Sequence, residues 1–256
     1  MLTQPLVIGH RGAGGHAPEN TLAAFRRGLQ LGADGVECDV HLSRDGRIVV
    51  VHDATLERTS NGTGRVGERS LAELQALDAG SWFGAEFAGE RIPSLTEVCA
   101  LLHEAERESG RGPWLFVELK HGDDVYPGIE AELLAEIERS GLSERLAVIG
   151  FDHRAIARLK ARQPGLRAGV LYDGRPVDST QLATAAGAGW IGPSVKWVDA
   201  AEVRRARAAG LEVFAWTANE AEAMRRVLAA GVTAVGSDYP DRLLALRDAN
   251  GPSGSS

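Results

Sequence analysis

Short apolar segments alternate with amphipathic segments along nearly the whole chain of 256 residues. Apolar runs bounded by Gly, Pro and polar residues are typical of β-strands, and the amphipathic segments have the helical period of about 3.6 residues. We expect strands at residues 5–9, 35–40, 114–119, 146–151, 167–171, 189–192, 211–216 and 233–237. We expect helices at residues 20–31, 94–109, 125–140, 153–162, 178–187, 199–209 and 219–230. Eight strands, most followed by a helix, with no break in composition predict an α/β protein of one domain, residues 1–248, followed by a disordered tail, residues 249–256. The expected architecture is a (β/α)8 barrel, a TIM barrel, and the alternative is a doubly wound open sheet.

One stretch interrupts the alternation between the second strand and the second helix. Asp45-Gly46 is a strong hairpin signal between two apolar runs, so the second strand should gain an antiparallel partner that ends at His52. Residues 53–93 then form an insertion rich in Gly, Ser, Thr and Arg, with a helical piece near 70–78. A segment of this length inside a domain is often a lid or a substrate-binding element, and the alternative is an ordered surface excursion.

The composition argues against several classes of protein. A formal net charge of −7 and a pI near 5.6 argue against a nucleic-acid-binding surface, which normally carries a basic patch. No segment has the length and hydrophobicity of a membrane span, and no secretory signal is recognisable, so we expect a cytoplasmic location. The two cysteines, Cys38 and Cys99, lie far apart, which argues against a metal-binding motif and a disulfide framework.

The first expected strand ends in two residues suited to binding an anion. Apolar residues 6–9 are followed directly by His10 and Arg11, and then by a glycine-rich turn. Reactive side chains of α/β folds lie at the carboxyl ends of their strands. A titratable base beside a permanent cation suits an anionic substrate, above all a phosphate. Pro18 is expected at the start of the following helix.

Acidic residues on two further strands predict a metal site. Side chains alternate along a strand, so Glu37 and Asp39 share one face, which should point into the barrel. Glu118 and Lys120 repeat this arrangement on the next strand. Buried carboxylates repel each other unless a positive charge lies between them, and a hard divalent cation such as Mg²⁺ or Ca²⁺ suits an all-oxygen site. The alternative is an ion-pair network without a metal.

Other polar residues near the strand ends have two interpretations each. His52 follows the expected hairpin strand, and with His10 it could divide the work of general acid and general base, or it could be a hydrogen-bonded structural residue. Asp53 could orient an imidazole or start a turn. Glu19 and Asn20 could cap the first helix or belong to the site. Trp216 could pack in the core or form a wall against an organic substrate group.

Taken in order, these motifs resemble those of the glycerophosphodiester phosphodiesterases, a family of barrel enzymes that cleave deacylated phospholipids. The resemblance extends from Val7 to about Arg242. Its motifs are His10-Arg11-Gly12, Pro18-Glu19-Asn20-Thr21, Glu37-Cys38-Asp39-Val40, His52-Asp53, Leu56-Glu57-Arg58-Thr59 with Asn61-Gly62-x-Gly64, Ile92-Pro93-Ser94-Leu95, Glu118-Leu119-Lys120, Trp216-Thr217 and Ser237-Asp238-Tyr239-Pro240. Each motif alone is a weak signal, whereas their order and spacing together are highly specific.

The resemblance implies metal-dependent hydrolysis of glycerophosphodiesters, such as glycerophosphocholine and glycerophosphoethanolamine, to sn-glycerol 3-phosphate and an alcohol. It implies that His10 and His52 are the acid–base pair, and that Arg11 and Lys120 contact phosphate. It also implies one divalent cation, Mg²⁺, Ca²⁺ or Mn²⁺, with three ligands: Glu37, Asp39 and Glu118. The resemblance is to the cytoplasmic, bacterial-type branch, and we expect a monomer or a homodimer without stable membrane insertion.

Several alternatives stay open at this point. Either histidine could be the base, and either water or the glycerol 2-hydroxyl of the substrate could attack first. A phospholipase D-like or lysophospholipid phosphodiesterase would need an apolar rim at the barrel mouth, which Trp82, Phe83 and Phe87 could supply. A catalytically silent phosphodiester-binding protein would not need the His10 and His52 pair.

Overall fold

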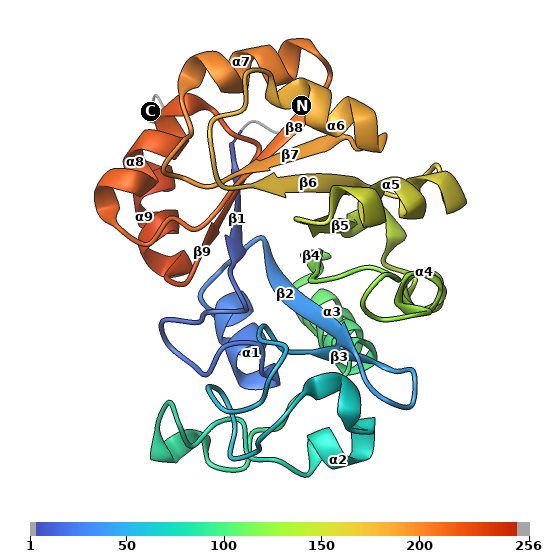
Figure 1. Ribbon diagram of the computed structural model, residues 1–256. Coiled ribbons are helices and arrows are strands. Elements are labelled where there is room, and N and C mark those ends of the chain that lie inside the picture. Colours follow the sequence, from blue (N-terminus) through green and yellow to red (C-terminus); the bar gives the residue numbers. More distant parts are fainter. Residues whose placement is uncertain (1–3, 250–256) are drawn as a thin grey trace.

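The computed structural model describes residues 4–249, and its centre is a closed barrel of eight parallel strands. The barrel strands are β1 Leu6–Gly9, β2 Gly35–Leu42, β4 Trp114–Leu119, β5 Leu146–Gly150, β6 Ala168–Tyr172, β7 Trp190–Pro193, β8 Glu212–Ala215 and β9 Ala234–Ser237. Neighbours follow the order β1-β9-β8-β7-β6-β5-β4-β2, and a further pairing of β1 with β2 closes the ring. The expected (β/α)8 barrel is therefore confirmed, and the open sheet is excluded (Figure 1).

The hairpin expected after the second strand is also present. Strand β3, Ile48–Val50, pairs antiparallel with the end of β2, with His41 opposite Val49. The turn between them contains Gly46 at a φ of +74°, the left-handed region that glycine adopts without strain. This extension carries the chain to His52 beside the end of β2.

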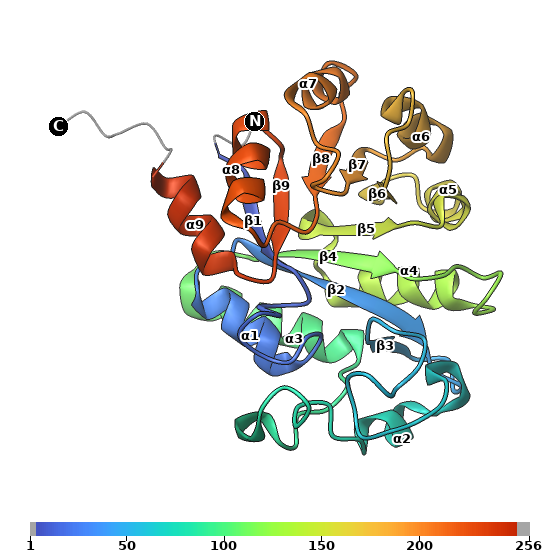
Figure 2. The ribbon, with the colours of Figure 1, turned by 60° about the vertical axis from the view of Figure 1, so that its left-hand side comes forward.

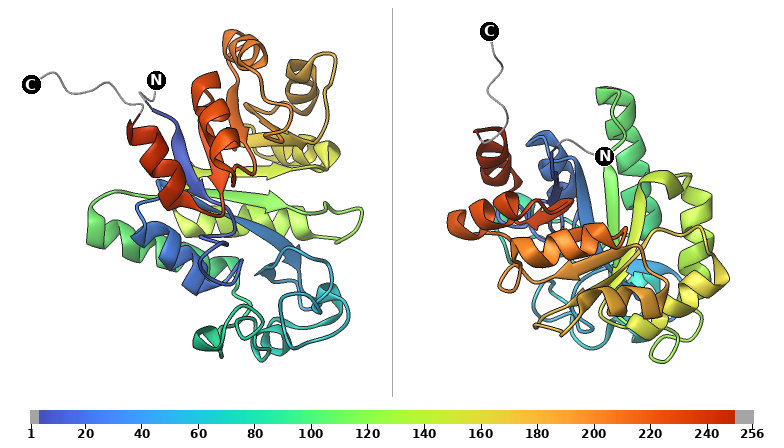
Figure 3. Two further views of the ribbon diagram at one scale, coloured as in Figure 1. Left: turned by 90° about the vertical axis from the view of Figure 1, so that its left-hand side faces the viewer. Right: turned by 90° about the horizontal axis from the view of Figure 1, so that it is seen from above.

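Helices surround the barrel, as Figures 2 and 3 show from other sides. They are α1 Leu22–Gln30, α2 Leu71–Gln75, α3 Leu95–Ser109, α4 Ile129–Ser140, α5 His153–Arg162, α6 Ser179–Ala186, α7 Ala200–Ala208, α8 Ala221–Ala230 and α9 Pro240–Ala249. Short 3-10 turns lie at Val66–Glu68, Ala85–Phe87 and Ser143–Arg145. Capping explains several starts; Ser94, for example, forms a capping box with Glu97 at α3. The sequence-based assignment did not include α9.

The start of α1 differs from the prediction. Pro18 is not a helical residue, since the helix begins at Leu22. Its N-cap is Thr21, whose Oγ1 accepts a hydrogen bond from the Ala24 amide at 3.2 Å. The turn before the helix is therefore longer than expected, and it places the side chain of Asn20 on Asp39 and that of Glu19 on Arg11.

Side-chain alternation along the strands divides the core into two layers. Outward residues such as Val36, Cys38 and Val40 pack against the helices. Inside the barrel a smaller cluster includes Phe116, whose ring stacks on that of Phe214 at 4.7 Å between centroids. Because this apolar cluster fills part of the interior, the barrel is a packed core rather than a pore.

The insertion after β3 forms a small core together with the inner side of that hairpin strand. The cluster consists of Val49, Val51, Leu56, Val66, Leu74, Ala79 and Ile92, all buried. Figure 1 shows this segment as a lobe beside β3, with α2 as its longest helix. The insertion is therefore ordered, and the helical piece expected near 70–78 is shortened to α2.

Three aromatic residues of the insertion pack on one another. Trp82 contacts Phe83 edge to face, and Phe83 contacts Phe87 in the same way, with centroids 5.6 and 5.5 Å apart. Among the described residues, no helix is both long enough and apolar enough to cross a membrane. The tail expected to be disordered, residues 249–256, lies outside the described residues except for Ala249.

Candidate active site

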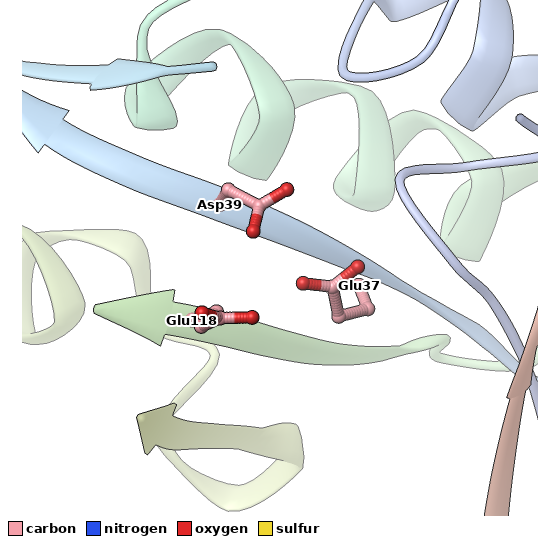
Figure 4. Close-up of side chains that lie close together, drawn as sticks. All are labelled: Glu37, Asp39 and Glu118. Atoms are coloured by element: carbon pink, nitrogen blue, oxygen red, sulfur yellow. The ribbon is translucent and has the colours of Figure 1, made fainter. Parts of the chain in front are cut away.

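Three carboxylates from neighbouring strands meet inside the barrel. Glu37 and Asp39 lie on β2, and strand register places Asp39 directly beside Glu118 of β4. Figure 4 shows the three side chains directed toward one another. One oxygen from each lies within 4.8 Å of the others, and the residues are 2%, 1% and 9% exposed. The face predicted from side-chain alternation is therefore the face that points inward.

Positive side chains only partly balance these acids. Lys120 Nζ donates to Glu118 Oε1 at 2.7 Å and to Asp39 Oδ1 at 3.3 Å. Burial opposes ionisation of Asp39, yet Lys120 and Arg11 bring the net pKa of its carboxyl below the usual range. Burial and the neighbouring Asp39 raise the pKa of Glu37 to about 8. Ionisation of all three carboxyls together is therefore unfavourable without a further positive charge, because burial and the mutual repulsion raise the pKa of both Glu37 and Glu118.

The donor set fits a hard divalent cation. All three side chains offer oxygen ligands, and such ligands suit Mg²⁺, Ca²⁺ and Mn²⁺. Glu37 Oε1 is buried and has no hydrogen-bond partner among the described residues, so it is an acceptor without a donor. A cation between the three carboxylates would satisfy this oxygen and relieve the repulsion that raises the pKa of Glu37.

His10 lies at the edge of this cluster, just after β1. Its Nε2 is 4.0 Å from Glu37 Oε2, while its Nδ1 is 2.7 Å from Asp238 Oδ1. An ionised carboxylate only accepts, so Nδ1 donates and Nε2 is left for a substrate. Burial lowers the pKa of His10, but the hydrogen bond to Asp238 and the charge of Glu37 raise it more.

Asp238 is the residue that sequence reasoning did not assign to the site. It follows β9, and its Oδ2 accepts a hydrogen bond from Asn219 Nδ2 at 2.6 Å. His10 and Asp238 meet because β1 pairs with β9 where the barrel closes. The signal available in the sequence was its place at a strand end, which resembles that of His10.

His52, at the end of the hairpin that extends β2, is paired with an aspartate in the same way as His10. Its Nδ1 lies 2.6 Å from Asp53 Oδ1, so Nε2 is again the ring nitrogen left over. The side chain is 30% exposed, and burial is the largest influence that lowers its pKa. Its backbone carbonyl accepts from His41 Nε2 at 3.0 Å, which fixes the end of the hairpin. Of the two interpretations of Asp53, the structure supports the orientation of an imidazole.

Arg11 and Asn20 hold the loop between β1 and α1 against the acids. Both have a positive φ, 51° and 58°, which is uncommon for residues other than glycine. The Arg11 amide donates to Glu37 Oε2 at 2.9 Å, and its Nη1 donates to Glu19 at 2.7 Å. Asn20 Nδ2 donates to Asp39 Oδ2 at 2.8 Å. Asn20 therefore contacts the acidic cluster, and its interpretation as a helix cap is wrong because Thr21 caps α1.

Trp216 follows β8, and its packing in the core is confirmed, whereas a contact with substrate stays a prediction. Its ring packs against the inner apolar cluster and lies edge to face on Phe151 at 5.3 Å. Its Nε1 donates to the Gly192 carbonyl at 2.7 Å, which fixes the ring. Phe151 is 45% exposed, so the pair presents an apolar wall beside the strand ends.

Comparison with known proteins decides the family. The model of the family described as "Glycerophosphoryl diester phosphodiesterase family" matches residues 10–242. The chain belongs to this family. Its range includes every residue placed above in the site, from His10 to Asp238, and the expected family and enzyme class are thereby confirmed.

Individual members of the glycerophosphoryl diester phosphodiesterase family are similar along nearly their whole length. A glycerophosphodiester phosphodiesterase from Caldanaerobacter subterraneus is 39% identical over 94% of this chain and 97% of its own. One from Bacillus subtilis is 31% identical over 92% of this chain and 84% of its own. A phosphodiesterase from Oleispira antarctica, solved with the product sn-glycerol-3-phosphate, superposes with a TM-score of 0.88 at 32% identity, covering 96% and 97% of the two chains.

Proposed function

We propose that this protein hydrolyses glycerophosphodiesters, such as glycerophosphocholine and glycerophosphoethanolamine, to sn-glycerol 3-phosphate and the free alcohol. In this proposal Glu37, Asp39 and Glu118 hold one divalent cation, and His10 and His52 are the acid and the base. The observation that carries it is the pair of histidines, each with Nδ1 bound to an aspartate, just after the two strands β1 and β3 that pair with the acid-bearing strand β2. The product-bound relative from Oleispira antarctica supports the substrate class.

The protein's own side chains account for binding of the phosphate. Arg11 and Lys120 are the cations nearest the acids, and they would hold the non-bridging phosphate oxygens. A cation bound by the three carboxylates would supply further positive charge against the negative charge that develops on the phosphate oxygens. Lys120 would then exchange part of its present contact with Glu118 for the substrate.

The two histidines account for the proton transfers. The Nε2 atom of one removes a proton from the attacking water or glycerol 2-hydroxyl, whose oxygen forms the new bond to phosphorus. If the 2-hydroxyl attacks, a cyclic phosphate forms, and water then opens it to sn-glycerol 3-phosphate. The Nε2 atom of the other donates a proton to the leaving alcohol oxygen as its bond to phosphorus breaks. Asp238 and Asp53 keep Nδ1 engaged in both rings, so the reactive nitrogen is the same in each. The wall formed by Trp216 and Phe151 is proposed to face the organic part of the substrate.

The histidine roles are tested by the variants His10→Ala and His52→Ala. Each is expected to lower kcat for release of sn-glycerol 3-phosphate from glycerophosphocholine by about 10²–10⁴-fold, the usual contribution of an acid or a base. His103→Ala is the matched control, because His103 lies on α3 and bonds the Ser140 carbonyl. Near-full activity of either His10→Ala or His52→Ala, with the control also active, would contradict the assignment.

The substrate class is tested by comparing glycerophosphocholine with lysophosphatidylcholine. The aromatic residues of the insertion pack on one another, and only Trp82 among them is largely exposed, at 42%. We therefore expect faster turnover of the water-soluble diester, and preference for the lysolipid would favour the lysophospholipid alternative. The cytoplasmic location and the oligomeric state stay predictions.

A further inference from the structure

One arginine of the insertion contacts the periphery of the candidate site. Arg58 lies shortly after Asp53, two residues beyond Leu56, which is buried in the core of the insertion. The sequence motif that contains it, Leu56-Glu57-Arg58-Thr59, has no part in the proposed phosphate binding or proton transfer. Its side chain is 45% exposed, so burial in the core does not explain its position.

The guanidinium of Arg58 forms hydrogen bonds to two different carboxylates. Nη1 and Nη2 donate to the two oxygens of Glu19, both at 2.8 Å, in the parallel geometry that a planar guanidinium favours. Nε and Nη2 donate to the two oxygens of Asp53, at 2.6 and 3.1 Å. One side chain therefore bridges residues that precede α1 and residues that follow β3.

Each of the two carboxylates also contacts a proposed functional group. Glu19 Oε1, which accepts from Arg58, also accepts from Arg11 Nη1 at 2.7 Å. Asp53 Oδ1, which accepts from Arg58, is also the partner of His52 Nδ1 at 2.6 Å. Arg58 thus stands between the partner of the phosphate-binding arginine and the partner of a proposed acid–base histidine.

Glu19 and Asp53 depend on Arg58 for their orientation because both side chains are partly exposed to solvent. The Glu19 and Asp53 side chains are 15% and 28% exposed. Without Arg58, Asp53 would keep only His52 among the hydrogen-bond partners described for it, and a carboxyl with one partner can rotate. The hydrogen bonds from Arg58 are the largest influence that lowers the pKa of Asp53 and keeps it ionised.

We propose that Arg58 is a positioning residue through which the insertion aligns His52 and Arg11, by fixing the carboxylates of Asp53 and Glu19. This inference rests on the proposed function, because it assigns catalytic work to His52 and Arg11. The insertion then contributes the guanidinium of Arg58 to the site, and the apolar core around Leu56 holds that side chain in position.

The test compares three variants. Arg58→Gln removes the charge and the fork, and Arg58→Lys keeps the charge but cannot donate to both carboxylates in one plane. Arg69→Gln is the control, since Arg69 belongs to the same insertion and donates to its Thr63 carbonyl. Residues that orient functional groups at metal sites contribute about 10–100-fold. We expect both Arg58 variants to lose about that factor in kcat for glycerophosphocholine, with a smaller change in KM and wild-type kcat in the control.

A second readout does not require turnover. The ring Nδ1 proton of His52 is expected to give an NMR signal through its bond to Asp53, and that of His10 through its bond to Asp238. In Arg58→Gln the His52 signal should shift or broaden, whereas the His10 signal should stay, because Asp238 does not contact Arg58. An unchanged His52 signal would overturn the proposal, and so would wild-type kcat in either Arg58 variant.

The two readouts separate this inference from the proposed function. If the wild-type protein releases no sn-glycerol 3-phosphate, the proposed function fails, and the His52 signal still decides whether Arg58 positions the ring. If the wild type is active and Arg58→Lys also has wild-type kcat, a nearby charge is sufficient and the bridge between the two carboxylates is disproved.

Discussion

Asp238 and Asp53 give the two histidines the same orientation in different surroundings. In both rings Nδ1 is bound to a carboxylate, and Nε2 is left for chemistry. His10 is the more buried of the two and lies beside Glu37, whereas His52 is 30% exposed at the end of the hairpin. These surroundings change the pKa values in opposite directions, upward for His10 and downward for His52. The pair is thus suited to hold one proton between them near neutral pH.

Replacement of Asp238 tests the orientation of His10. In Asp238→Asn the side chain keeps its shape but can present an N–H to the ring, so Nδ1 no longer has a fixed role as donor. We expect kcat to fall by about 10–100-fold, the usual effect of losing a partner that orients a functional imidazole. The measurement is steady-state release of sn-glycerol 3-phosphate.

The matched control is Asp241→Asn. Asp241 bonds His16 Nε2 at 2.8 Å in the same part of the chain, but His16 has no role in the proposed chemistry. This variant should keep wild-type kcat. Equal losses in the two variants would show that the effect is structural rather than specific to His10.

Site residues that share one strand could be predicted from the sequence, whereas contacts between residues of different strands could not. Glu37 and Asp39 were found together because side chains alternate along β2. Asp238 was not assigned, because its contact with His10 spans 228 positions and exists only when β9 pairs with β1. The sequence also favours Asn20 as a helix N-cap. Its left-handed backbone conformation, which directs the side chain to Asp39, cannot be recognised from the sequence pattern.

The folded structure of the insertion is stabilised by hydrogen bonds in its turns as well as by its small apolar core. Asp78 accepts hydrogen bonds from the amides of Gly80, Ser81 and Gly89, at 2.8–2.9 Å. These bonds join Ser81 and Gly89, which lie at the two ends of the loop that contains Trp82. They also stabilise the ionised carboxyl, so the pKa of Asp78 lies below its ordinary value of 3.8.

The pH dependence of stability tests this role of Asp78. A carboxyl whose folded pKa is depressed stabilises the fold above its unfolded pKa, here near 3.8, and this contribution is lost as the pH falls through the folded pKa. Asp78→Asn should therefore unfold more readily than wild type at pH 7, and the difference should narrow below about pH 4. Urea unfolding followed by tryptophan fluorescence at several pH values measures it.

A second acid of the same segment provides the comparison. Glu86 is exposed, and Glu86→Gln should leave the unfolding free energy close to that of wild type at each pH. A difference between Asp78→Asn and wild type that does not change with pH would disprove the role assigned to the ionised carboxyl.

Helices and strands with a clear hydrophobic pattern could be predicted from the sequence, and those with a weak pattern could not. Strand β2 and its hairpin partner follow from an apolar run and the Asp45-Gly46 turn. Helix α9 was not recognised, because it begins directly after the strand-end motif and only Pro240 and Leu243 are buried. Its packing on β1 and α8 therefore has little amphipathic signature in the sequence.

For the whole molecule, the closure of the barrel is what assembles the site. The eightfold alternation predicts a barrel, but the alternation does not say which strand ends meet. Closure between β1 and β2 brings Arg11 to Glu37, and closure between β1 and β9 brings His10 to Asp238. The acidic cluster then lies between strand ends, where α/β barrels bind their ligands.

Metal dependence is the most direct test of the proposed mechanism. In that mechanism, Arg11, Lys120 and both histidines act on a phosphate bound at the cluster of three carboxylates. The measurement is release of sn-glycerol 3-phosphate from glycerophosphocholine by protein stripped of metal with EDTA and then titrated with Mg²⁺, Ca²⁺ or Mn²⁺. Bound cations contribute several kcal/mol to such reactions, so metal-free protein should be slower by about 10²-fold or more, and at least one cation should restore turnover. Glu118→Gln should weaken the response to added metal. Full turnover by rigorously metal-free protein would contradict the assignment of Glu37, Asp39 and Glu118 as metal ligands.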